Sequence, residues 1–236
     1  MKLKENIEVK CRSANKHFKR NKNSWLRFAP LHIIANKFFR LSGRYVKRET
    51  MYNFSENSPE FDEPAVWALQ NFLLAEVEER FGIRDEDKII YQPTFGAEQP
   101  HIINTPDLDG AFACLSDNSK AYWPTTFYEL AHETVHLLNP VVGYTNYLEE
   151  GFAVLFSVDM SEEFTEHSQE PEQDDDHYIE AWNLICELSD DLYTAAQNIR
   201  EEFGSLGEAE VDGMIELFPD VDEDTLIKLC SVCDFT

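Results

Sequence analysis

Two histidines and a glutamate within the run HETVH, at positions 132–136, are the residues of this chain best placed to do chemistry. On a helix, side chains four positions apart lie on the same face, so His132 and His136 can offer two imidazoles to one metal ion. Glu133 would lie beside that ion, where it could take a proton from a bound water. A carboxylate from elsewhere would complete three ligands and leave a fourth position open, which suits hydrolysis rather than a structural role.

The residues around the motif predict that it lies on one bounded helix of about four turns. Pro124 and the two threonines after it can begin this helix, and Pro140 ends it because proline interrupts the hydrogen-bond ladder. Four apolar side chains give it a core-facing surface: Phe127, Leu130, Leu137 and Leu138. The alternative is that both histidines are ordinary helix residues and that Glu133 is solvated.

Two adjacent glutamates, Glu149 and Glu150, compete for the place of the third ligand. Asn146 has the position of an N-cap, and Glu149 would complete a capping box by reaching back to the Asn146 backbone N–H. Glu150 points about 100° away around the helix axis and shares the more buried-looking face with Ala153, Val154 and Ser157. A buried carboxylate needs a cation or a hydrogen-bond partner, and Gly151 allows another backbone to approach closely. We therefore expect Glu150 to be the ligand.

These two segments together resemble a known family. A His-Glu-x-x-His helix followed by a glutamate in a Trp-Leu-x-Glu-Gly-x-Ala-like run is similar to zinc metallopeptidases of the gluzincin type, and here that run reads YLEEGFA at 147–153. The resemblance covers roughly residues 121–158. It implies that His132, His136 and Glu150 bind Zn²⁺ and that Glu133 is the general base for hydrolysis of a peptide or protein substrate. The short interval between His136 and Glu150 implies a compact variant of the fold.

Other residues could assist this chemistry. In related enzymes a Tyr or His donates a hydrogen bond to the tetrahedral oxyanion, and four residues could do so here, each with packing or solvation as the alternative: Tyr144, Tyr147, His177 and Tyr178. His101 lies in an apolar, strand-like run and is expected to be a core or edge histidine. Cys230 and Cys233 lack a second Cys or His pair at zinc-site spacing, so we expect free thiols.

Composition limits the class of protein. A chain of 236 residues can bury a sizeable core, and no apolar stretch is long enough to cross a membrane. The first residues form no apolar signal segment, which leads us to expect a cytoplasmic location. Five scattered cysteines do not suggest a disulfide framework.

Charge is distributed very unevenly along the chain. Residues 1–48 hold 14 of the 20 Lys and Arg and only two acids, whereas residues 49–236 hold six basic and 43 acidic side chains. This asymmetry predicts a basic N-terminal arm, 1–48, beside an acidic body. The arm could dock on that body, bind nucleic acid or touch an anionic membrane. Docking is favoured electrostatically, because the acidic body would repel phosphate.

The pattern of elements predicts an α+β fold, with one acidic domain over 49–236. We expect a small mixed sheet above the motif helix and a mostly helical C-terminal part. The expected helices span about 58–80, 177–203 and 222–230, and the expected strands 88–91, 101–104 and 111–115. An acidic stretch over 160–176 is expected to be a solvated loop. A zincin-like upper half, whose sheet edge holds an extended peptide by β-addition, follows from the resemblance alone.

A function of a different class also fits the charge pattern. The chain could be a non-catalytic acidic binding or inhibitor module that docks on a charged partner, with a vestigial or structural metal site. One zinc per chain with chelator-sensitive cleavage would favour the enzyme. Metal-free protein with a tight macromolecular partner would favour the module.

Overall fold

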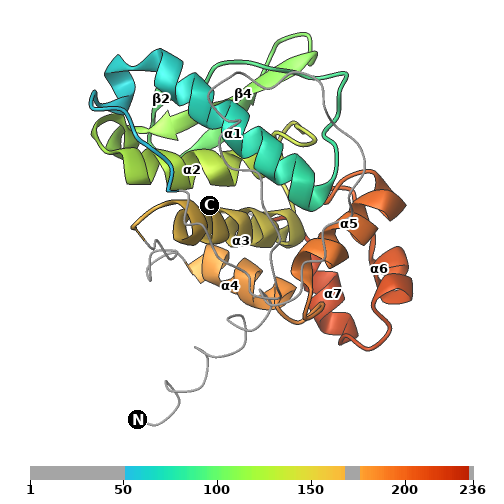
Figure 1. The fold of residues 1–236 in the computed structure, drawn as a ribbon. Helices are drawn as coiled ribbons and strands as arrows, with labels where there is room; N and C mark the ends of the chain where they lie inside the picture. The colour runs from blue at the N-terminus through green and yellow to red at the C-terminus, as the bar shows by residue number, and fades with distance from the viewer. Residues whose placement is uncertain (1–50, 168–175, 234–236) are drawn as a thin grey trace, which may run out of the picture.

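Seven α-helices and a four-stranded sheet make up the part of the chain that this computed structural model describes, residues 51–167 and 176–233 (Figure 1). The predicted basic arm, 1–48, lies outside the described residues, as do residues 168–175 of the predicted acidic loop. The loop prediction was wrong at its start, because the third helix, α3 (Tyr147–Phe164), continues through Ser161–Phe164. In the described residues, no helix is long and apolar enough to cross a membrane.

The sheet is mixed, as expected, and is built around its longest strand. β1 and β2 pair parallel to β4, and β3 pairs antiparallel to it. Cys114 of β4 pairs with Thr94 on one edge and with His101 on the other, so β2 and β3 lie on opposite edges. The strands are β1 (Ile89–Ile90), β2 (Thr94–Ala97), β3 (His101–Asn104) and β4 (Gly110–Ser116). Three of them were predicted. β2 was not, since its sequence, TFGA, contains a glycine at φ +123° and gives little strand signal.

The first long helix, α1 (Glu63–Phe81), confirms the helix expected over 58–80. A 3₁₀ turn, η2 (Pro59–Phe61), precedes it, and the Asp62 side chain caps it by accepting a hydrogen bond from Ala65 N at 3.1 Å. Gly82 ends the helix at φ +95°, a conformation that an L side chain adopts at a cost.

α3 lies between two other helices and is buried on nearly every side. Figure 1 shows α2 (Trp123–His136) on one side of it and α4 (Asp176–Ile185) on the other, with α1 and the sheet beyond α2. This setting explains why α3 carries apolar residues all around its axis: one stripe holds the fully buried Leu148, Phe152, Phe156 and Met160, and the other faces hold the buried Val154, Leu155 and Val158. Phe81 at the end of α1 meets Phe152 and Phe156 edge to face, with ring centroids 5.9 and 5.8 Å apart.

The C-terminal part is helical, as predicted, but it is divided differently. The single helix expected over 177–203 was wrong: the chain forms α4, leaves the helix after Ile185, and begins α5 (Leu192–Phe203). The Asp191 side chain accepts a hydrogen bond from Thr194 N at 3.1 Å and so starts a new helix. α6 (Val211–Leu217) was not predicted, whereas α7 (Glu223–Leu229) confirms the helix expected over 222–230.

Candidate metal centre

The motif helix α2 is held in a fixed rotation by polar contacts on its other faces. Glu129 accepts hydrogen bonds from the backbone N–H and the hydroxyl of Ser116, at 2.9 and 2.5 Å, which ties the helix to the end of β4. The hydroxyl of Thr134 accepts a hydrogen bond from Gln70 of α1 at 2.9 Å. These contacts leave the face that carries the two histidines directed at α3, where both side chains are buried.

The start of α3 is fixed just as firmly. Asn146 caps it by accepting a hydrogen bond from Glu149 N at 2.9 Å. The amide nitrogen of Asn146 donates to the carbonyls of Leu206 and Gly207, at 3.0 and 3.2 Å, in the segment between α5 and α6. A segment near the C-terminus adds a second attachment, because Tyr147 N donates to Ser231 O at 3.1 Å.

His132, His136 and Glu150 converge on one buried point. The Nε2 atoms of the two histidines lie 3.2 Å apart, and the Glu150 carboxylate oxygens lie 3.2 Å from Nε2 of His132 and 3.6 Å from Nε2 of His136. One ligand atom from each of the three residues lies within 4.8 Å of the others, so the cluster could hold a metal ion. The structure thus brings together the three residues that the sequence nominated as ligands.

The role expected for Glu149 was wrong in one respect. Asn146 does cap the helix, but the Glu149 carboxylate does not reach back to the Asn146 N–H among the described hydrogen bonds. Its Oε1 lies 2.8 Å from Nδ1 of His136, the ring nitrogen that faces away from Glu150. A capping box is a local pattern, and a histidine thirteen residues earlier competes with it only once the two helices pack together. The two adjacent glutamates therefore have different contacts: Glu150 lies against both histidines at their Nε2 atoms, and Glu149 binds His136 at Nδ1.

The charges in this cluster are strongly coupled. Burial alone would raise the pKa of Glu150, but His136 and His132 hold it below its usual range. Burial alone would lower the pKa of His136, but the carboxylates of Glu150 and Glu149 raise it to about 10. A positive charge is therefore favoured at the point where these side chains meet.

The donor set fits a divalent cation. Oε2 of Glu150 is buried and lies 3.2 Å from Nε2 of His132 without a well-aligned hydrogen bond, and Oε2 of Glu133 is buried with no hydrogen-bond partner. Buried carboxylate oxygens without a partner are costly, and a bound ion would offset that cost. Two imidazoles and a carboxylate form a ligand set that suits zinc and leaves room for a further ligand.

Glu133 lies in the same buried region with a raised pKa. Burial is the main cause of this rise, and the neighbouring His132 and His136 oppose it. His101 opposes it as well. The expectation of a core or edge histidine at 101 is confirmed for the edge, since the residue is exposed on β3.

Of the four candidate hydrogen-bond donors, one lies directly against a predicted ligand. The ring of Tyr178, on α4, meets the ring of His132 edge to face, with centroids 5.3 Å apart. The hydroxyl of Tyr147 lies 3.2 Å from Nδ1 of His177, so these two residues bind one another. Tyr144 is 59% exposed in the loop before α3. The structure therefore brings Tyr178 to the cluster and leaves Tyr144 at the surface.

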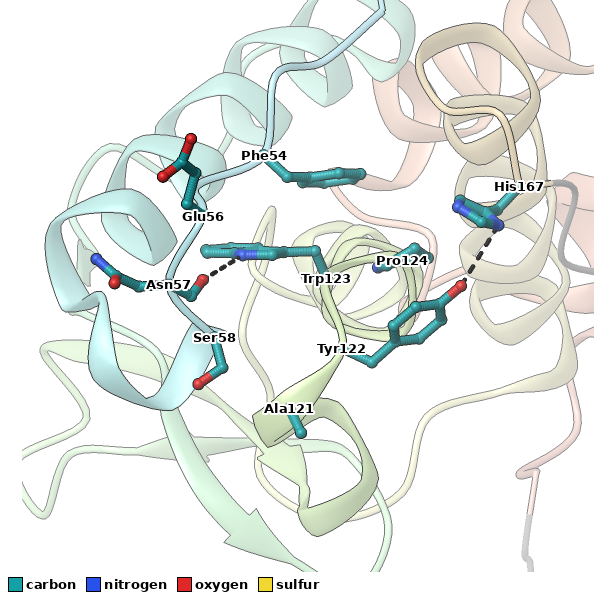
Figure 2. Close-up of a pocket in the computed structure, with 9 residues that line it drawn as sticks. All are labelled: Phe54, Glu56, Asn57, Ser58, Ala121, Tyr122, Trp123, Pro124 and His167. Atoms are coloured by element: carbon teal, nitrogen blue, oxygen red, sulfur yellow. Dashed lines mark hydrogen bonds between the residues drawn. The ribbon is translucent and has the colours of Figure 1, made fainter.

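A surface pocket at the other end of α2 is separate from this cluster (Figure 2). It has a volume of about 360 Å³. Phe54 stacks on Trp123 in it, and Trp123 donates a hydrogen bond to Asn57 O at 2.8 Å. Trp123 is nine residues before His132, about 14 Å along the helix. Since none of the three cluster residues lines the pocket, we assign it no part in the metal centre.

Comparison with known proteins gives no match for this chain, whether to a family model, to a curated protein or to a solved structure. The resemblance to gluzincins therefore depends on the residues of α2 and α3 alone.

Proposed function

We propose that this protein is a zinc-dependent peptidase of the gluzincin type. The observation that carries the proposal is the buried convergence of His132, His136 and Glu150, with a buried Glu133 carboxylate oxygen, Oε2, that has no hydrogen-bond partner in the same region. A purely structural zinc site is usually closed by four protein ligands, whereas three ligands next to a free carboxylate are the pattern of a hydrolytic site.

When bound, a zinc ion would supply a Lewis acid that polarises a carbonyl and activates water. Glu133 would accept a proton from the attacking water and return it to the leaving nitrogen. Its raised pKa suits both transfers, since a carboxylate with a pKa closer to neutrality takes up a proton more readily. Its burial keeps bulk water from competing for that proton.

One further residue and one edge of the sheet are proposed to act on the substrate. Tyr178, packed against the ring of His132, would donate a hydrogen bond to the developing oxyanion. β3 pairs with β4 along one edge, and its other edge is not paired with any strand in the described part of the chain. An extended peptide could add to this free edge by backbone hydrogen bonds. The order of sheet, α2 and α3 supports a zincin-like arrangement of this kind.

The test separates metal binding from hydrolysis. The purified chain should contain about one zinc per molecule and should cleave a denatured-protein or peptide-library substrate until a chelator removes the metal. Glu133→Gln should keep the zinc and lose about 10²- to 10⁴-fold in rate, the range for loss of a general base. Glu216→Gln, an exposed glutamate of α6, is the matched control and should leave both unchanged.

Two outcomes would count against the proposal. Wild-type activity in Glu133→Gln would remove the role of that residue. A wild-type chain that holds one zinc and cleaves nothing would overturn the peptidase, and a tight macromolecular partner would then favour the non-catalytic acidic module.

A further inference from the structure

Glu149 stands in a position to control the ring of His136. A carboxylate can only accept a hydrogen bond, so at 2.8 Å the Nδ1 atom of His136 must be the donor. A neutral imidazole that carries its proton on Nδ1 has its lone pair on Nε2. That Nε2 atom is the one that faces His132 and Glu150. The contact therefore selects the ring form and the ring orientation that a metal ion requires.

Glu149 is itself held in place by a distant segment. Its side chain is 5% exposed, and its backbone N–H is bound by Asn146. Gly207, between α5 and α6, lies so close that a Cβ at this position would be 2.7 Å from Oε2 of Glu149. The carbonyls of Leu206 and Gly207 bind the Asn146 amide, so this segment and the start of α3 form one packed unit. A side chain at 207 would have to displace the Glu149 carboxylate.

From these contacts we infer that Glu149 is a positioning residue of the metal centre and that the segment at Gly207 keeps it in place. This inference rests on the proposed metal site, but it does not depend on peptide hydrolysis. It predicts that a residue 71 positions after His136, which touches none of the three ligands in the described contacts, affects the affinity for zinc.

The experiment measures zinc affinity of the full chain by competition with a chelator of known affinity. Glu149→Ala should bind zinc about 10- to 100-fold more weakly, the usual cost of losing a carboxylate behind a metal-binding histidine. Glu149→Gln keeps an oxygen that can accept the Nδ1 hydrogen bond and should recover most of that loss. Gly207→Ala should weaken binding by less than Glu149→Ala, because the carboxylate is displaced rather than removed.

Controls separate positioning from folding. Glu208→Ala removes an exposed carboxylate from the same segment and should leave the affinity unchanged. The melting temperature of each metal-free variant shows whether it is folded, and the near-isosteric Glu149→Gln keeps the test usable if Glu149→Ala unfolds.

The outcomes are distinct. Equal zinc affinity in wild type and a folded Glu149→Ala would overturn the inference while leaving the three ligands in place. So would a Glu149→Gln variant as weak as Glu149→Ala, because the hydrogen bond would then not be the cause. If the expected order of affinities appears in a protein that cleaves nothing, the positioning role stands and the peptidase proposal fails. A wild type that binds no zinc would overturn both.

Discussion

The carboxylates at the two ends of α3 have different partners. At the start of the helix, Oε2 of Glu150 is buried and has only an imidazole nitrogen, Nε2 of His132 at 3.2 Å, as a nearby partner, without a well-aligned hydrogen bond. Near its end, Asp159 accepts a hydrogen bond from Tyr193 at 2.8 Å, and Glu163 pairs with Arg80 at 2.7 Å. The second group, which we call the Arg80 cluster, obtains its positive charge from the protein itself.

This difference shows how an ion-binding site can be recognised within a core built mainly of helices. Both groups contain acids close to a cation or a potential cation, so the presence of acids alone does not separate them. They differ in whether the protein itself supplies cationic partners for the carboxylates. The Arg80 guanidinium lies 3.4 Å from the Tyr193 hydroxyl and over the Tyr193 ring, which ties the carboxylates to α1 and α5. The group at Glu150 offers only imidazoles, which bind a metal as readily as a proton.

The largest expected effect comes from Glu150→Gln, which removes the carboxylate ligand at the start of α3. Loss of a direct ligand should weaken zinc binding by more than about 100-fold, the upper range for loss of a residue behind a ligand. Zinc at 100 times its Kd would stabilise the wild type by about 2.7 kcal/mol, and this gain should vanish in the variant. Metal content and melting temperature with and without zinc measure it. A variant that still melts higher with zinc would show that Glu150 is not a ligand.

The second largest effect is expected for the Arg80 cluster, near the end of α3. Arg80→Met keeps an apolar stem but leaves the partly buried Asp159 without its nearby cation, so we expect a loss of about 1 to 2 kcal/mol in unfolding free energy, the cost of leaving a polar group without its partner. Zinc affinity should not change. The control is Arg84→Met, whose pair with Glu78 is partly exposed and should be worth less than about 1 kcal/mol. Urea unfolding of the metal-free chain measures both. A weaker zinc affinity in Arg80→Met would mean that the two ends are coupled.

The cluster of His132, His136 and Glu150 could be predicted from the sequence because it depends on residues that lie close together in the chain. The spacing of His132 and His136 places them on one helical face, and Asn146 is an N-cap residue that indicates the start of the next helix. Glu150 could be chosen over its neighbour because helical rotation places the two on different faces. Each of these steps needs only a few residues of sequence.

The same reasoning missed what depends on packing between distant segments. The partner of Glu149 is a histidine of another helix, and Gly207 reaches the same carboxylate from the segment after α5. The Arg80 cluster joins α1, α3 and α5 and has no sequence signature. The acidic residues at the end of α3 suggested a loop by composition, but burial of the apolar residues beside them keeps that turn helical.

The smallest expected effect tests whether the charge of Asp159 in the Arg80 cluster destabilises the folded chain. Burial raises the pKa of Asp159, and the Tyr193 hydrogen bond and Arg80 only partly oppose that rise. A raised pKa in the folded state contributes stability below the pKa of the unfolded chain, about 3.9, and this contribution is lost as the pH rises through the folded value. Asp159→Asn keeps an acceptor for Tyr193 without the charge. Its stability relative to wild type should therefore improve between pH 4 and pH 7, measured by urea unfolding of the metal-free chain. If the difference instead moves in favour of wild type with rising pH, the Asp159 charge stabilises the fold, and Arg80 does more than offset its burial.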